Sequence, residues 1–79
     1  MEIKVLGPGC KNCKNLAKVV QDAVAELKID ARIEKVEDMD QIVQAGIMIT
    51  PGLIINGKVK STGKVPKKDA VIKMIQEEA

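Results

Sequence analysis

Two cysteines separated by two residues stand where a short apolar run ends and a helical pattern begins, and this pair constrains the fold more than any other feature. Cys10 and Cys13 follow the segment Gly-Pro-Gly at residues 7–9, which breaks regular structure. A helix that starts here holds both thiols in its first turn. They can then close a small disulfide ring and open it again without unfolding the chain, so we predict a dithiol–disulfide switch.

The reactive form of such a pair is the thiolate, which is scarce for a free cysteine with a pKa of about 8.5. A helix N-terminus carries about half a positive charge and unpaired N–H groups, and both stabilise an anion. We expect Cys10 to gain most from this field, to be the more exposed thiol and to attack as the nucleophile. Cys13, one turn further along, would resolve the mixed disulfide. Lys11 and Lys14 add positive charge, and the predicted helix has no acidic residue before Asp22.

Composition limits what else the chain can do. Of its 79 residues 46% are hydrophobic, but none is Phe, Trp or Tyr, so the core must be aliphatic and nucleobases have no aromatic side chain to stack on. A net charge of +2 does not favour a polyanionic partner. We expect no nucleic-acid binding, no membrane span and no signal peptide. The expected location is cytoplasmic, where a close cysteine pair is more often catalytic, redox-sensing or metal-binding than structural.

The first half of the chain alternates strand-like and helix-like patterns. Strands are predicted over residues 1–6 and 31–36, where apolar and polar side chains alternate. Between them, apolar residues recur every three or four positions, which predicts a helix over residues 13–28. Asp38 is expected to cap a short second helix that Gly46 ends in a left-handed conformation. This order predicts a parallel strand pair joined by a right-handed crossover.

The second half predicts a hairpin and a last helix. Residues 53–55 are uninterrupted aliphatics, as in a central strand that is covered on both faces. The Asn-Gly pair at residues 56–57 suits a type I′ turn, because both residues tolerate positive φ. A lysine-rich strand over residues 58–62 would then form the sheet edge. Pro66 is expected to open the last helix, and residues 77–79 are expected to fray.

The Cys10–Cys13 pair at the start of the first helix, the order of the elements and the Thr50–Pro51 pair before the third strand resemble the thioredoxin and glutaredoxin superfamily. Three segments make the resemblance more specific. They are GPGCKNC at residues 7–13, MDQI at 39–42 and PGLIING at 51–57. Over nearly the full length the chain is similar to small archaeal and bacterial thioredoxin-like proteins, often described as redox-active disulfide protein 2. The resemblance implies a single α/β domain over residues 1–79. Its thioredoxin-like three-layer fold would have the order βαβαββα, with a four-stranded mixed sheet flanked by three helices.

The resemblance also implies a mechanism and roles for individual residues. Cys10 matches the nucleophilic and Cys13 the resolving cysteine of a thiol–disulfide oxidoreductase. Pro51 matches a cis-proline that faces the disulfide, and Thr50 matches the residue whose backbone pairs with a bound partner. The implied partners are disulfide-containing target proteins and a reductase or small-thiol donor, with no bound cofactor and no metal, and the chain is expected to be a monomer. The implied contact surface around the thiols comprises Pro8, Gly9, Lys11, Asn12, Thr50, Pro51 and Gly63.

Three positions depart from typical thioredoxins. Gly9 stands where those proteins have an aromatic residue, and Lys-Asn at residues 11–12 replaces a Gly-Pro pair. Lys4 occupies the strand position of an aspartate that typical members bury beneath the second cysteine.

Other functions for the cysteine pair stay open at this point. Two thiolates can bind copper(I), or half-fill a zinc site, but the chain has no His and no third Cys, so zinc would need a dimer sharing four cysteines. A regulatory or binding module could keep the fold without fast turnover. A permanent disulfide is the weakest alternative, because so small a ring removes little unfolded-state entropy. Met39, Met48 and Met74 are expected to fill the core rather than to bind a soft metal.

Overall fold

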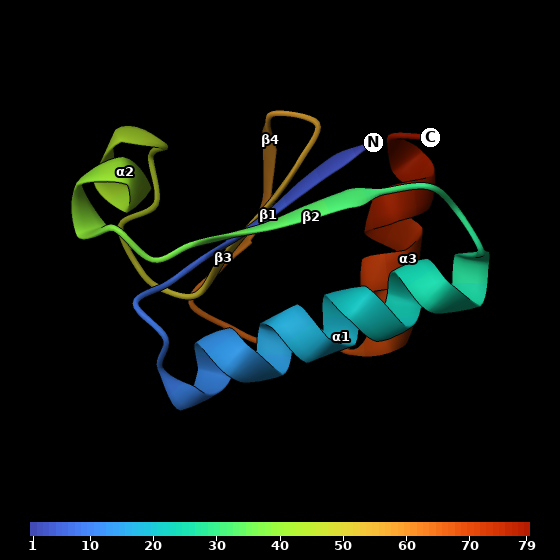
Figure 1. Cartoon of the computed structure of the whole chain (residues 1–79), viewed down its shortest axis with the longest axis horizontal. Coiled ribbons are helices and arrows are strands. Elements are labelled where there is room, and N and C mark those ends of the chain that lie inside the picture. The colour runs from blue at the N-terminus through green and yellow to red at the C-terminus, as the bar shows by residue number, and fades with distance from the viewer.

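The computed structural model describes all 79 residues and arranges them as a four-stranded sheet with helices on both faces (Figure 1). The strand order is β2-β1-β3-β4, in which β1 and β2 are parallel and the other neighbouring pairs are antiparallel. This confirms the α/β fold class and the order βαβαββα. The elements are β1 (Glu2–Leu6), α1 (Lys11–Leu27), β2 (Arg32–Val36), α2 (Met39–Gln44), β3 (Gly52–Ile55), β4 (Lys58–Thr62) and α3 (Lys68–Glu77).

Two apolar clusters hold the layers together, one on each face of the sheet. Along β1, Ile3 and Val5 face α1 and α3, whereas Leu6 packs with Ile42 of α2. Because helices cover both faces at the centre of the sheet, all four residues of β3 are buried, as predicted for a central strand. The cluster on the α1 and α3 side of the sheet is the larger of the two and includes Leu16, Val20, Leu53, Ile55, Val71 and Ile75.

The predicted turn and cap residues adopt the expected conformations. Oδ1 of Asp38 accepts hydrogen bonds from the backbone N–H groups of Asp40 (2.8 Å) and Gln41 (3.4 Å), and so caps α2. Gly46 follows that helix with φ at 88°. Asn56 and Gly57 join β3 to β4 with φ values of 50° and 82°, the two positive angles that a type I′ turn requires.

The C-terminal segment differs from its prediction. Helix α3 starts at Lys68 with Lys67 as N-cap, so Pro66 lies before the helix, where it is buried, and does not open it. The penultimate residue, Glu78, has ionic partners that the sequence did not suggest. Glu78 pairs with Lys60 at 2.8 Å and with Lys58 at 3.3 Å, and these contacts fasten the end of α3 to β4.

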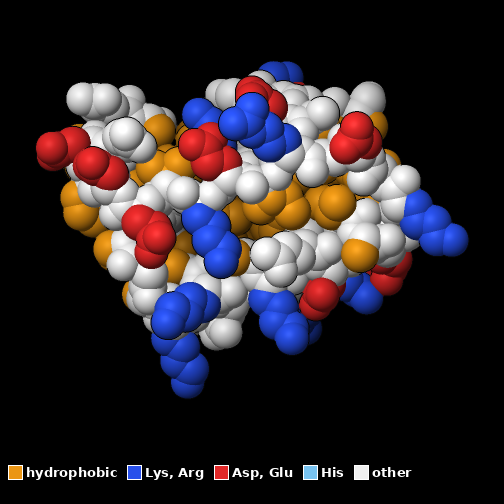
Figure 2. Space-filling view, viewed as in Figure 1, with side chains coloured by type: hydrophobic (Ala, Val, Ile, Leu, Met, Phe, Trp, Pro, Cys, Tyr) orange, Lys and Arg blue, Asp and Glu red, His pale blue; other side chains and the backbone are white.

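Two of the three methionines that were expected to fill the core lie at the surface instead. Met39 is 52% and Met48 is 88% exposed, and only Met74 packs against the core. The short helix α2 turns only Ile42 fully inward, and Met48 lies in the loop that leads to β3, so neither exposed methionine has a core position to fill. Side chains of both charges are interspersed over the face seen in Figure 2. The structure contains no helix with the length and hydrophobicity needed to cross a membrane.

Candidate active site

The two cysteines form a disulfide at the start of α1. Their Cα atoms are 5.0 Å apart. Cys10 is the N-cap residue, and its Sγ accepts a hydrogen bond from the backbone N–H of Cys13 at 3.2 Å. Cys10 is exposed, whereas Cys13 is only 5% exposed. Helix α1 begins at Lys11, two residues before the start expected from the apolar spacing, and the predicted difference in exposure is confirmed.

Gly7 brings the end of β1 against the buried sulfur. Its N–H donates to the carbonyl oxygen of Val36 at 2.9 Å, which fixes the loop beside the end of β2. A Cβ atom added at Gly7 would overlap Sγ of Cys13 and would lie 3.9 Å from Cα of Pro51. Only a residue without a side chain allows this close packing of the three segments.

The loop that carries Pro51 completes one side of the site. The Thr50–Pro51 peptide bond is cis, as the resemblance implied. Pro51 is buried and accepts a hydrogen bond through its carbonyl oxygen from the N–H of Gly63, at 2.8 Å. A Cβ atom added at Gly63 would lie 2.8 Å from Cγ2 of Ile49. The loop of Pro51 thus contacts the loop of Gly63 on one side and lies near Gly7, which itself touches Cys13, on the other.

The remaining predicted contact residues differ in their exposure to solvent. Pro8, Lys11 and Asn12 are exposed, and Thr50 is half-buried. Lys11 and Asn12 occupy the first turn of α1 between the cysteines. Gly9 is half-buried with φ at 92°, a conformation that favours glycine.

A small cavity beside Cys13 contains charged residues that sequence reasoning missed. We call it the Cys13 cavity; it measures about 90 Å³ and is lined by Val5, Gly7, Gly9, Cys13, Lys14, Ala17, Lys35 and Glu37. A Cβ atom added at Gly9 would lie only 3.0 Å from Oε2 of Glu37. The surroundings of the thiols are therefore not exclusively basic, contrary to what the helix sequence alone suggested.

A signal for Glu37 was present in the strand order. The carboxyl ends of parallel strands meet at one edge of a sheet. Here β1 leads into the cysteine loop, and the parallel strand β2 leads directly into Glu37. The residue after the second strand should therefore have been considered as a neighbour of the thiols.

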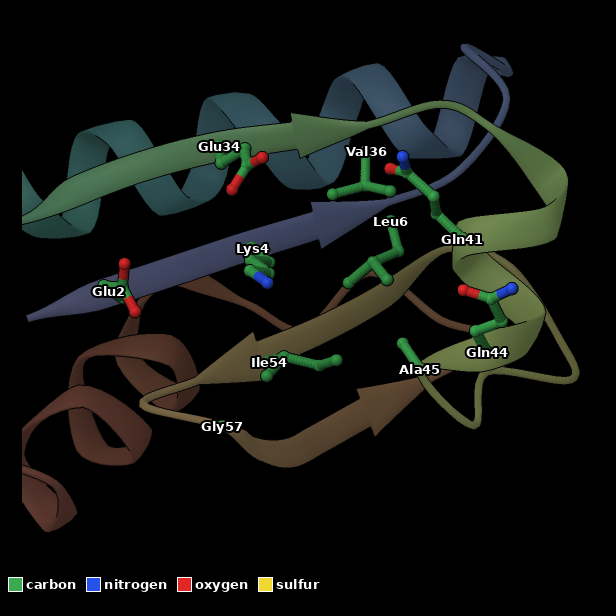
Figure 3. A pocket seen from close by; sticks show the side chains of 10 residues that line it. All are labelled: Glu2, Lys4, Leu6, Glu34, Val36, Gln41, Gln44, Ala45, Ile54 and Gly57. Atoms are coloured by element: carbon green, nitrogen blue, oxygen red, sulfur yellow. The ribbon is translucent and has the colours of Figure 1, made fainter.

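Matching strand positions with typical thioredoxins suggested that Lys4 lies beneath Cys13, but the structure places it elsewhere. It is exposed and lines a separate groove on the α2 face of the sheet (Figure 3). Cys13 instead lines a cavity on the α1 face, together with Val5 and Ala17. Glu2 and Glu34 flank Lys4, and Gln41 and Gln44 of α2 close one end (Figure 3). This groove is larger, at about 370 Å³, but it is remote from the sulfur chemistry. Lys4 is therefore not beneath the second cysteine, and the carboxylate that lines the Cys13 cavity belongs to Glu37.

Comparisons with known proteins agree with this geometry. Residues 1–76 match the thioredoxin domain family. A protein named thioredoxin from Methanothermobacter thermautotrophicus is 44% identical over 75 residues, which cover 95% of this chain and 97% of the relative. A thioredoxin from Methanocaldococcus jannaschii is 35% identical over 69 residues, which cover 87% of this chain and 79% of that protein.

Proposed function

This chain belongs to the thioredoxin domain family and is a thiol–disulfide oxidoreductase, and we propose that Cys10 is its attacking thiol and Cys13 its resolving thiol. The observation that carries the assignment is the difference between the two sulfurs. Cys10 is exposed at the N-cap of α1, where a target can reach it, whereas Cys13 is buried behind it. A target disulfide therefore meets Cys10 first.

The proposed reaction moves two electrons from the protein dithiol to a target disulfide. The Cys10 thiolate attacks one target sulfur, the target S–S bond breaks, and the released target thiolate takes up a proton. Cys13, as a thiolate, then attacks Sγ of Cys10 in the mixed disulfide. The second target thiol leaves and the Cys10–Cys13 disulfide remains. A reductase or a small thiol must return two electrons to restore the dithiol.

The start of α1 supports this role for Cys10. The backbone N–H of Cys13 already points at Sγ of Cys10, at 3.2 Å. Hydrogen bonds to an ionised acceptor are stronger than those to a neutral one, so this contact favours the thiolate over the thiol. The positive end of the helix dipole and the ammonium group of Lys11 act in the same direction.

The proposed partner surface lies around the exposed sulfur. The surface we propose comprises Pro8, Thr50, Pro51 and Gly63, and the exposed side chains of Met48 and Ile49, in the loop that leads to Pro51, add apolar area to it. Such a surface suits an extended segment of a disulfide-containing protein. The proposal also includes a monomeric single domain over residues 1–79 that works in the cytoplasm, where a reducing pool can regenerate the dithiol.

Trapping the intermediate tests the two roles. Incubated with a disulfide-containing model protein, the reduced Cys13→Ser variant should accumulate a mixed disulfide at Cys10, because no second thiol is present to release the target. The Cys10→Ser variant should accumulate far less, because Cys13 is buried. Mass spectrometry of alkylated samples measures both. Equal trapping by the two variants, or trapping only in Cys10→Ser, would contradict the assignment.

A further inference from the structure

We propose that helix α2 and the loop after it bind disulfide-containing target proteins that carry basic and aliphatic side chains next to their disulfide. This inference rests on the proposed function, because it names a class of target for the same exchange reaction. The surface, called the α2 surface below, combines four apolar and two acidic side chains. All six are exposed: Met39, Val43, Met48, Ile49, Asp38 and Asp40.

The apolar part of the α2 surface is a concentration of exposed hydrophobic side chains. Four of the five large hydrophobic side chains that the chain exposes belong to it, with exposed fractions from 52% for Met39 to 88% for Met48. Met39 and Val43 are four residues apart on α2, so they lie on the same side of the helix. Exposed apolar groups gathered in one place mark a contact site for another protein.

The acidic end of the α2 surface lies next to the cysteine loop. A Cβ atom added at Gly9 would lie 3.0 Å from Oε2 of Glu37. Gly9 directly precedes Cys10, and Glu37 directly precedes Asp38, the N-cap of α2. A target that reacts with the exposed sulfur therefore comes close to the start of α2.

The loop after α2 carries the apolar area toward the cis-proline. The N–H of Ile47 donates to the carbonyl oxygen of Ile42 at 3.2 Å, which holds this loop against the end of the helix. Met48 and Ile49 follow directly, and Ile49 is two residues before Pro51. The α2 surface is therefore continuous with the partner surface proposed above.

The charges around α2 are of one sign. Residues 36–57 contain three acidic residues, Glu37, Asp38 and Asp40, whereas all 13 Lys and Arg residues and the other eight acidic residues lie outside this segment. Acidic and hydrophobic side chains lie together over α2, at the left of the view (Figure 1, Figure 2). The rest of the chain thus has an excess of positive charge, and a basic target is attracted specifically to this end of the molecule.

Helix α1 has the opposite charge near the disulfide. Lys11 and Lys14 are exposed in its first turns, and no large hydrophobic side chain is exposed along this helix. A target with basic side chains is repelled there, and over α2 it gains both ionic attraction and apolar contact. Attraction on one side and repulsion on the other select the target and fix its orientation.

Two synthetic peptides test the target class. They share one disulfide ring and carry beside it either a Lys-Leu-Lys or a Glu-Leu-Glu tail. Acid quenching, alkylation and mass spectrometry give the rate constant for their reduction by the reduced full chain. At low ionic strength, Asp40→Asn should lower the rate constant for the Lys peptide by about two- to fivefold, the size of one exposed ion pair, and should not lower it for the Glu peptide.

A second variant tests the apolar part. Met48→Ala should lower the rate constants for both peptides by about threefold or more, because each peptide buries its leucine against this side chain. In the wild type, 1 M NaCl should remove the part of the Lys-peptide rate that depends on Asp40, since charges are then screened beyond about 3 Å.

Asp30→Asn and Val59→Ala are the matched controls. Each removes the same kind of exposed side chain from outside the α2 surface, so both rate constants should equal those of the wild type. Asp40→Glu keeps the charge and should retain the wild-type preference. Urea midpoints close to that of the wild type show that the variants are folded.

The outcomes separate this inference from the proposed function. Equal effects of Asp40→Asn and Asp30→Asn on the Lys peptide would overturn the inference, as would an equal fall for both peptides in Asp40→Asn. A Met48→Ala variant no slower than Val59→Ala would overturn it as well. A wild-type protein that reduces neither peptide would instead contradict the proposed function itself.

Discussion

Gly7 and Cys13 are packed so closely that a Cβ atom at position 7 would overlap the buried sulfur. The contact joins the end of β1 to the first turn of α1, and the same glycine lies near Cα of Pro51. The disulfide therefore depends on a backbone position as well as on its two cysteines. Any side chain at residue 7 has to displace the sulfur or the loop.

Gly7→Ala tests this contact. Because a methyl group in a filled site forces its neighbours apart, we expect the oxidised protein to lose about 1–3 kcal/mol of unfolding free energy in urea. The fraction of disulfide at a fixed glutathione ratio should also change, since the displaced atom is a reacting sulfur. Gly46→Ala is the control: nothing lies within 4 Å of an added Cβ there, so it should affect stability through its positive φ alone and leave the disulfide fraction unchanged. An unchanged disulfide fraction in Gly7→Ala would contradict the contact.

Glu78→Gln tests the attachment of the C-terminus. The hydrogen bond from Lys60, more than any other contact, holds the pKa of Glu78 below its ordinary value of 4.5. A carboxylate with a lowered pKa in the folded state stabilises the fold above its unfolded pKa and ceases to do so as the pH falls through the folded one. The variant should therefore have a lower urea midpoint than the wild type at pH 7, and the difference should vanish in acid below the lowered pKa.

The same carboxyl-to-amide change at Glu34, for which the structure shows no ion pair, should leave the midpoint at pH 7 nearly unchanged. A Glu78→Gln midpoint that differs from the wild type equally at pH 7 and in acid would show that the ion pair is not the cause.

Leu16→Ala and Met48→Ala test where the core ends. Leu16 is fully buried between α1 and the sheet, so its truncation should cost about 2–5 kcal/mol of unfolding free energy. Met48 is 88% exposed, and its truncation should cost less than about 0.5 kcal/mol. Urea unfolding followed by circular dichroism measures both. Comparable losses would mean that Met48 packs into the core after all.

Features that local chemistry sets were predictable from the sequence. Cys10 caps a helix because a glycine-containing breaker precedes it and helix-forming residues follow it. Asp38 and the Asn56–Gly57 pair act through hydrogen bonds and backbone angles within a few residues of themselves. Such features depend little on what the rest of the chain does, so the element order and the thiol positions could be derived directly.

Features that depend on which segments meet in space were harder to predict. Met48 is as apolar as a core residue, but it lies in the loop between α2 and β3, where its side chain is exposed. Glu78 forms ion pairs with two lysines of a strand about twenty residues earlier in the chain. Glu37 is 24 positions after Cys13, and parallel pairing of β1 with β2 brings it to the same cavity. The sequence contains each of these residues, but it does not show which residues become their neighbours in space.

A redox equilibrium titration tests the central claim most directly. The purified protein is equilibrated over a range of thiol–disulfide buffers, and alkylation with mass spectrometry reports the fraction of Cys10–Cys13 disulfide. We predict a reversible two-electron transition between about −300 and −180 mV, absent in Cys10→Ser. Failure to form the intramolecular disulfide, or protection of both thiols from alkylation until a chelator is added, would contradict the exchange mechanism and indicate metal binding instead.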